Sequence, residues 1–95
     1  MTTNQRTALI TGSGQNIGRA IALNLADAGF QIVLNGAKNA DNCNAVAKTI
    51  KENGGKAVVA MGDIGVREQA LDIAQTGINA FGAIDVLVNL SLIHI

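Results

Sequence analysis

Four short apolar segments alternate with three longer segments whose apolar residues recur at helical spacing. The short segments span 7–11, 31–35, 57–61 and 85–89, and the helix-like segments between them span 17–28, 40–52 and 66–81. Strands that are apolar on both faces are typical of a parallel sheet covered by helices on its two sides. The alternation indicates right-handed βαβ crossovers. The sequence therefore predicts an α/β chain with a partial Rossmann, doubly wound fold: four parallel strands in the order 3-2-1-4 with helices on both faces.

Each helix-like segment carries an apolar stripe and is followed by a glycine. The stripes are Ile17, Ile21, Leu25 and Ala28 in the first segment, Cys43, Val46, Ala47 and Ile50 in the second, and Val66, Ala70, Ile73, Ala74, Gly77, Ile78 and Phe81 in the third. Gly29, Gly54 and Gly82 stand where helices commonly end on a residue with positive φ. We expect Phe30 and Phe81 to pack between the helices and the sheet.

A glycine-rich turn joins the first predicted strand to the first predicted helix. It reads Thr-Gly-Ser-Gly-Gln-Asn-Ile-Gly over residues 11–18. Backbone N–H groups in such a turn approach a phosphate closely because glycine has no Cβ, and the helix N-terminus adds about half a positive charge. The dinucleotide fingerprint G-x-G-x-x-G begins with Gly12 and Gly14 but meets Ile17 in place of its third glycine. The turn predicts a phosphate site without matching that fingerprint, and the alternative is a turn that binds no ligand.

The loops that follow the four predicted strands are expected to meet. In a doubly wound sheet, ligands bind outside the carboxyl ends of the strands, at the point where the strand order reverses. The loops at that edge are residues 11–18, 35–38, 62–64 and 89 onward, and all of them carry polar or small residues. Four such loops favour a nucleotide-binding crevice more strongly than the glycine turn does alone.

Three of these segments resemble motifs of the short-chain dehydrogenase/reductase family. Residues 11–18 resemble its Thr-Gly-x-x-x-Gly-Ile-Gly turn, with Asn16 in place of the middle glycine. The departure is mild, because asparagine tolerates left-handed backbone and is a good helix N-cap. Asp63-Ile64 resembles the family's Asp-Val pair, and residues 81–89 resemble its Phe-Gly-x-Ile-Asp-Val-Leu-Val-Asn segment, which leads into Asn-Asn-Ala-Gly. The resemblance covers residues 7–89 and implies an NAD- or NADP-dependent oxidoreductase that moves a hydride between nicotinamide and a carbonyl or alcohol carbon of a small-molecule substrate.

The resemblance implies a cofactor-binding set drawn from all four loops. The set is Gly12, Ser13, Gly14, Gln15, Asn16, Ile17, Ala37, Asp63, Ile64 and Asn89. In the family the carboxylate equivalent to Asp63 receives the adenine amino group; the alternative is a loop acid that caps the next helix. No residue is assigned as a metal ligand.

The family's catalytic group is a Tyr-x-x-x-Lys pair with a serine, in which the tyrosine donates or takes the proton. These residues lie beyond the fourth strand in the family, and this chain contains no tyrosine. We therefore expect residues 1–95 to form an incomplete dinucleotide-binding domain that is inactive alone, family-like to Asn89 and followed by an atypical tail at 90–95. Ser91 and His94 of the tail have no orienting acid beside them, so we do not expect a nucleophile and base there.

Cofactor choice is expected to depend on the loop after the second strand. An acidic residue about 20 residues beyond the glycine turn usually selects NAD, and a basic residue nearby accommodates the 2′-phosphate of NADP. Residues 35–37 are Asn-Gly-Ala, Gln15 is neutral, and Lys38 is the nearby cation. NADP is slightly favoured over NAD.

The charge balance excludes several classes of partner. Seven basic and seven acidic residues give a net charge of zero, and the basic residues are spread along the chain, so neither nucleic acid nor an anionic membrane is expected as a partner. No apolar run approaches the roughly 18 residues of a membrane-spanning helix. The single Cys43 cannot form an internal disulfide, which makes the cytoplasm the default location. We expect Cys43 to be a small buried hydrophobe rather than a reactive thiol.

Two other functions remain open. A non-catalytic nucleotide-binding module would need only the glycine turn and Asp63. A methyltransferase of related topology would need an acid at the end of the second strand to hold the ribose, and Asn35 and Gly36 argue against it. If the fourth strand is a sheet edge, residues 86–88 expose an uncharged ladder that recruits another chain. We therefore expect marginal stability and self-association of this chain, and a homo-oligomeric complete enzyme.

Overall fold

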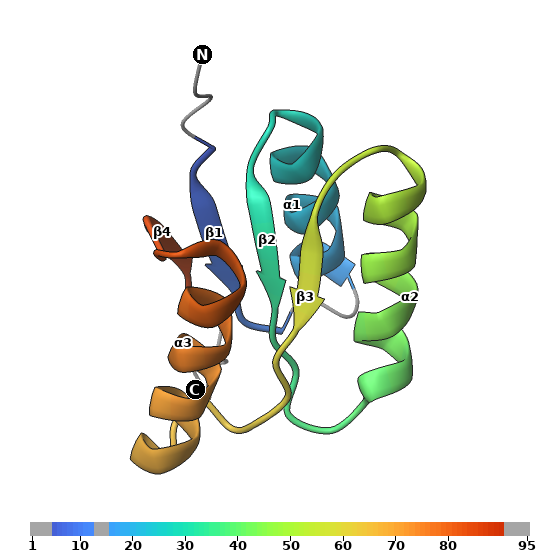
Figure 1. The fold of residues 1–95 in the computed structure, drawn as a ribbon. Coiled ribbons are helices and arrows are strands. Elements are labelled where there is room, and N and C mark those ends of the chain that lie inside the picture. Colours follow the sequence, from blue (N-terminus) through green and yellow to red (C-terminus); the bar gives the residue numbers. More distant parts are fainter. Residues whose placement is uncertain (1–4, 13–15, 91–95) are drawn as a thin grey trace.

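The computed structural model describes residues 5–12 and 16–90, which form a sheet with helices on its two sides (Figure 1). The elements, in chain order, are β1 (Thr7–Ile10), α1 (Asn16–Asp27), β2 (Gln31–Leu34), α2 (Ala40–Glu52), β3 (Ala57–Val59), α3 (Arg67–Phe81) and β4 (Val86–Val88). Each predicted strand ends one or two residues later than the observed one, because the residues at its carboxyl end turn into the following loop.

The strands pair in parallel in the order β3-β2-β1-β4, as predicted. β1 lies in the interior of the sheet, with Ile10 opposite Leu34 of β2 and opposite Val88 of β4. β4 is an edge of this sheet. We predicted self-association of the chain for this arrangement, in which residues 86–88 lie at the edge. Helices α1 and α2 lie on one face, and α3 lies on the other (Figure 1).

The α1 and α2 face of the sheet carries the larger core. Alternate strand residues point to it because side chains along a strand alternate between faces. They include Ala8 and Ile10 of β1 and Ile32 and Leu34 of β2, all fully buried. The predicted stripe of α2 (Cys43, Val46, Ala47 and Ile50) is buried against them, and Phe30 packs at the border of this core. Cys43 is therefore buried, as predicted.

The α3 face carries a smaller core of Leu9, Val33, Ala60 and Ile73, with Phe81 packed at its border. Gly77 sets how closely α3 approaches the sheet. A Cβ at this position would lie 2.9 Å from Val33 Cγ2 and 3.1 Å from Ile84 Cδ1. The helix can therefore rest on the sheet at this distance only with glycine there.

Two predicted helix stripes are partly wrong. In α1, Ile17 is 69% exposed, and Gly18 and Ala22 are the buried residues; Ala28, just beyond the helix, is also exposed. Small residues face the sheet here because they let the helix approach closely. Of the stripe predicted for the third helix, Val66, which is the N-cap residue of α3, and Ile78 are exposed, while Ile73 and Gly77 are buried.

The predicted helix ends are confirmed at their glycines. Gly29 has φ of 102° just beyond α1, Gly54 has φ of 87° beyond α2, and Gly82 caps α3 in left-handed conformation with φ of 89°. The N–H of Gly82 donates to the carbonyl of Ile78 at 2.7 Å, which satisfies one of the free carbonyls at the helix end.

Candidate functional site

The loops after the four strands meet at the carboxyl edge of the sheet. This follows from the parallel register, in which Ile10, Leu34, Val59 and Val88 lie side by side. Backbone hydrogen bonds join the next residues across the edge: Thr11 N–H donates to Val88 at 3.0 Å, Asn35 N–H to Ile10 at 3.0 Å and Gly62 N–H to Gly36 at 3.0 Å. The predicted site residues that the structure describes are therefore gathered at one edge, from four separate loops.

The glycine turn leads from β1 into α1. Gly12 has φ of 62°, a left-handed backbone that strains any residue with a Cβ. Asn16 has φ of 55° and is the first residue of α1, so the asparagine adopts the left-handed conformation that the sequence led us to expect it to tolerate. Ser13, Gly14 and Gln15 lie outside the described residues. Ile17 is exposed at the N-terminal end of α1, next to the turn.

Thr11 ties the glycine turn to the end of β4. Its buried hydroxyl accepts a hydrogen bond from the Leu90 N–H at 2.6 Å and donates to Asn89 Oδ1 at 3.2 Å. Leu90 in turn packs at the border of the larger core and lies 3.9 Å from the position that a Cβ of Gly12 would occupy. The predicted residues Gly12 and Asn89 are thus held beside each other by a threonine that was not in the predicted set.

Asn35 ties the end of β2 to the loop after β3. Its side chain is buried, and Nδ2 donates to the carbonyls of Ala60 at 2.9 Å and Gly62 at 3.1 Å. These bonds stabilise the two loops relative to each other.

Packing restricts which residue can stand at position 36, in the loop after β2. A Cβ on Gly36 would lie 2.9 Å from Cys43 Sγ and 3.4 Å from Met61 Cε. A larger residue at position 36 would therefore have to displace the side chains beneath it. Ala37 and Lys38, which follow, are exposed, so the cation of this loop is free to meet a ligand.

Asp63 organises the loop between β3 and α3. Its Oδ1 accepts from the Gly65 N–H at 2.9 Å, and its own N–H donates to Gln69 Oε1 at 2.7 Å. The N-cap of α3 is Val66, which makes no side-chain cap hydrogen bond. Asp63 therefore closes the turn before α3 rather than occupying the cap position. Asp63 is exposed, and the neighbouring Ile64 packs at the border of the smaller core.

One groove in the described part of the chain lies away from these residues. A groove of about 620 Å³ lies between α2 and β3, lined among others by Ala47, Lys51 and Val59, and shares no residue with the predicted site. Over residues 5–12 and 16–90, no helix is long and apolar enough to cross a membrane. In the same part of the chain, no three His, Cys, Asp or Glu side chains are grouped so that they could hold a metal ion.

A parallel sheet in the order β3-β2-β1-β4, with a glycine turn leading from the interior strand β1 into a helix, defines the Rossmann-type class of α/β proteins. The family follows from the sequence. The model of the short chain dehydrogenase family matches residues 6–91, so the chain belongs to that family.

Individual relatives agree with this assignment. The chain is 36% identical to elsinochrome reductase 1 from Elsinoe fawcettii over 84 residues, covering 88% of this chain and 32% of the relative. It is 33% identical to the 3-oxoacyl-acyl-carrier-protein reductase FabG of Staphylococcus epidermidis over 84 residues, covering 88% of this chain and 34% of that protein. A crystal structure of hydroxysteroid dehydrogenase from Escherichia coli superposes with a TM-score of 0.84 at 37% identity, over 88% of this chain and 35% of that one. The chain thus spans about a third of the length of these relatives.

Proposed function

We propose that this chain binds an NAD(P) dinucleotide at the carboxyl edge of its sheet, as the N-terminal cofactor-binding part of a short-chain oxidoreductase. The complete enzyme would transfer a hydride between the nicotinamide and a carbonyl or alcohol of a small molecule. The observation that carries the proposal is the gathering of four loops at one edge, with Gly12 and Asn16 in left-handed backbone beside the N-terminus of α1. Family membership supports it.

In this proposal, each loop contacts a different part of the cofactor. The backbone N–H groups of residues 12–17 and the N-terminus of α1 hold the pyrophosphate. Asp63 and Ile64 contact the adenine, and Ala37 lies beside the adenosine ribose. Asn89, which Thr11 holds next to Gly12, closes the opposite side of the turn. When bound, the cofactor supplies the redox chemistry, and these residues bind and orient it.

We propose NADP rather than NAD as the preferred cofactor. No acid stands at residues 35–38 to hold the ribose hydroxyls, as NAD-selective proteins require, and an acid at position 36 would crowd Cys43 Sγ. The exposed Lys38 can pair with a 2′-phosphate.

The 95-residue chain alone is proposed to bind cofactor without turning over substrate. The tyrosine that the family resemblance assigns to proton transfer has no counterpart here, because the chain contains no tyrosine. A non-catalytic nucleotide-binding module is the second candidate, and it predicts the same binding without any requirement for further catalytic residues. The complete enzyme is proposed to be a cytoplasmic homo-oligomer.

The test is a titration of the chain with NADPH and with NADH, followed by nicotinamide fluorescence, which no Trp or Tyr of the chain obscures. Gly12→Ala places a Cβ in left-handed backbone at the turn and should weaken NADPH binding by about tenfold or more. Gly82→Ala is the matched control. It imposes comparable backbone strain at φ of 89°, with no neighbour near the added Cβ, but it lies at the opposite edge of the sheet. Equal affinities of the two variants, or no binding by the parent chain, would contradict the proposal.

A further inference from the structure

Strand β3 forms the edge of the sheet opposite to β4. Among the described residues, β3 pairs with β2 and with no other strand. Figure 1 shows β3 between α2 and α3, with no further element beyond it. The groove of about 620 Å³ between α2 and β3 lies along this edge. An edge strand with a groove beside it is a place where an extended segment of another chain can add to the sheet.

The backbone of β3 directs two N–H groups and two carbonyls away from the sheet. In the ladder to β2, the Lys56 carbonyl accepts a hydrogen bond at 3.0 Å, and the Ala60 N–H donates one at 2.8 Å. Successive residues of a strand direct their backbone groups to opposite sides, so Val58 faces β2, whereas Ala57 and Val59 face outward. These four outward groups have the regular spacing that a further strand can pair with.

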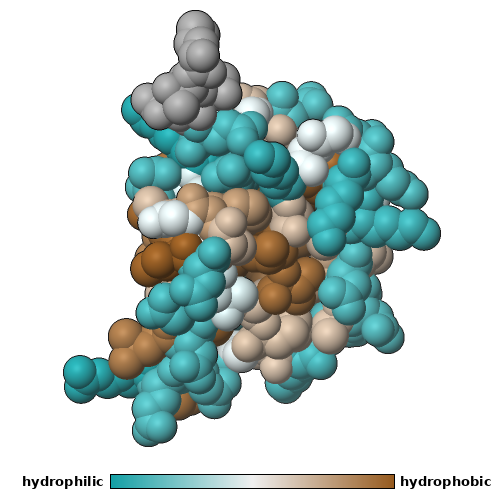
Figure 2. All heavy atoms as spheres, viewed as in Figure 1, coloured by the Kyte–Doolittle hydropathy of each residue, from teal (hydrophilic) through white to brown (hydrophobic). Residues whose placement is uncertain are grey.

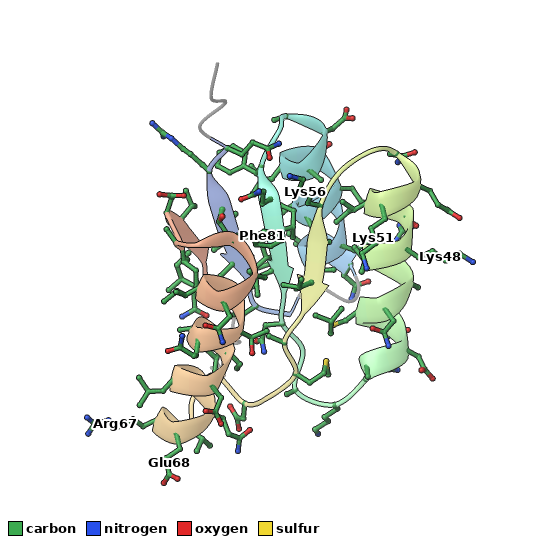
Figure 3. All side chains as sticks on the ribbon, in the orientation of Figure 1. Lys48, Lys51, Lys56, Arg67, Glu68 and Phe81 are labelled. Carbon is green, nitrogen blue, oxygen red and sulfur yellow. The ribbon has the colours of Figure 1, made fainter. Side chains whose placement is uncertain are left out.

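The side chains beside this edge form an apolar floor and a positively charged rim. Ala47 of α2 and Val59 of β3 line the groove and pack in the larger core. Lys48 and Lys51 are exposed and also line it, together with one carboxylate, that of Glu52. Figure 3 shows Lys51 extending from α2 toward β3. Figure 2 shows hydrophobic surface at β3 and hydrophilic residues beside it over α2. The rim therefore favours an occupant with acidic side chains.

The position of β4 bears on whether the rest of a longer polypeptide covers this groove. The chain spans about a third of the length of the relatives that it matches. Leu90, the last described residue, follows β4, and both β1 and β2 lie between β4 and β3. A strand that continues the sheet next to β4 adds on the side away from β3. The β3 edge therefore stays open when the sheet grows from β4.

A second copy of this chain is a poor match for the same edge. Two β3 strands that pair antiparallel about a two-fold axis place both α2 helices on the same face of the joined sheet. Lys48 and Lys51 of the two copies then lie on either side of one shared groove. Like charges that face each other across paired strands are destabilising. An acidic segment meets opposite charge at the same place.

We propose that the groove between α2 and β3 is a docking site for an extended, acidic segment of a partner protein, which adds to β3 as a further strand. The backbone of the segment pairs with the outward groups of Ala57 and Val59. Its side chains alternate between the two faces of the sheet. Those on the α2 face carry carboxylates to Lys48 and Lys51, and those between them lie beside Val58. The groove shares no residue with the predicted cofactor site, so the proposal does not depend on cofactor binding.

Fluorescence anisotropy with a labelled peptide tests the charge requirement. The probe alternates valine and glutamate over about six residues, the usual length of a strand. The same peptide with lysine in place of glutamate should bind at least about tenfold more weakly. Lys51→Glu should weaken binding of the acidic peptide by about fivefold, and Glu52→Gln should strengthen it by about twofold.

Arg67→Glu is the matched control, because it makes the same change of charge on α3. Figure 3 shows Arg67 pointing away from the body of the molecule, at a distance from the groove. This variant should bind the acidic peptide as the parent chain does. No binding by the parent chain, equal affinities for the acidic and basic peptides, or equal effects of Lys51→Glu and Arg67→Glu would overturn the proposal.

Amide hydrogen exchange followed by NMR tests strand addition in the parent chain, without any variant. In the free chain, the N–H groups of Ala57 and Val59 should exchange faster than that of Val58, which faces β2. Saturating acidic peptide should slow the exchange of Ala57 and Val59 by about tenfold or more. Binding that leaves both amides unprotected would show that the peptide is held by its side chains alone, and it would overturn strand addition.

Two alternately N-methylated forms of the acidic peptide give a second readout of strand addition. N-methyl groups on the residues that face β3 remove the donors that pair with it, whereas N-methyl groups on the other residues point away. One of the two forms should therefore lose binding and the other should keep it. Equal binding by both forms would contradict a paired strand.

Discussion

Replacing Thr11 with valine tests how the glycine turn and the end of β4 are held together. Valine keeps the β-branched shape, and the backbone bond from residue 11 to Val88 at 3.0 Å is unaffected. The variant removes the hydroxyl that accepts from Leu90 N–H at 2.6 Å and that donates to Asn89 Oδ1 at 3.2 Å. A donor left without its acceptor in a partly buried place costs about 1–2 kcal/mol. The free energy of unfolding should fall by that amount, and the Asn89 side chain should lose its hydrogen bond to residue 11.

Urea unfolding followed by circular dichroism measures the first effect, and NADPH titration measures the second. We expect about a fivefold to tenfold loss of affinity, equivalent to about 1–1.4 kcal/mol. Thr7→Val is the matched control at the opposite end of β1, where Thr7 Oγ1 donates to Gln31 Oε1 at 3.1 Å. It should cost about 0.5–1.5 kcal/mol of stability and leave cofactor affinity unchanged. If Thr11→Val binds NADPH as tightly as Thr7→Val does, the claim that Thr11 positions the site is refuted.

Three further substitutions test the packing around the site by urea unfolding. Ile73→Ala should destabilise the chain by about 2–5 kcal/mol, because Ile73 is one of the few buried residues of the smaller core; a loss below about 1 kcal/mol would mean that α3 is loosely packed. Gly36→Asp should cost about 1–3 kcal/mol through its contact with Cys43 Sγ. Adding Cys43→Ala should recover part of that loss, and strictly additive effects would argue against the contact. Asn35→Ala should cost about 2–3 kcal/mol because it removes one buried and one partly buried hydrogen bond, against about 1 kcal/mol for the exposed N-cap variant Asn39→Ala; equal losses would count against the role of Asn35.

The fold was predictable because its signals are local. Alternating strand and helix periods set the α/β class, and glycines after each helix marked the ends. Asn16 could be expected to adopt left-handed backbone from its residue type, and it has φ of 55°. Right-handed crossovers limit the possible strand orders, and the observed β3-β2-β1-β4 is the order of the Rossmann fold rather than the 2-1-3-4 order of the other common doubly wound fold.

Other features depend on contacts between residues far apart in the sequence. The bond from Leu90 to Thr11 joins residues 79 positions apart, so no local pattern could identify Thr11 as the link between the two loops. The packing of Cys43 under Gly36 is equally remote from the sequence pattern. In α3, helical spacing is compatible with either of two adjacent apolar stripes facing the sheet. The fit of Gly77 against Val33 and Ile84 selects one of them, and Ile78 is left exposed.

The central claim is that four loops at the carboxyl edge of the sheet form one dinucleotide site. An NMR titration of the ¹⁵N-labelled chain with NADPH tests it most directly, because each backbone amide reports its own environment. We predict that the shift changes will cluster in residues 11–18, 36–38, 62–65 and 89–90. Changes confined to the groove between α2 and β3 or to the opposite edge of the sheet, or no changes at saturating cofactor, would contradict the account.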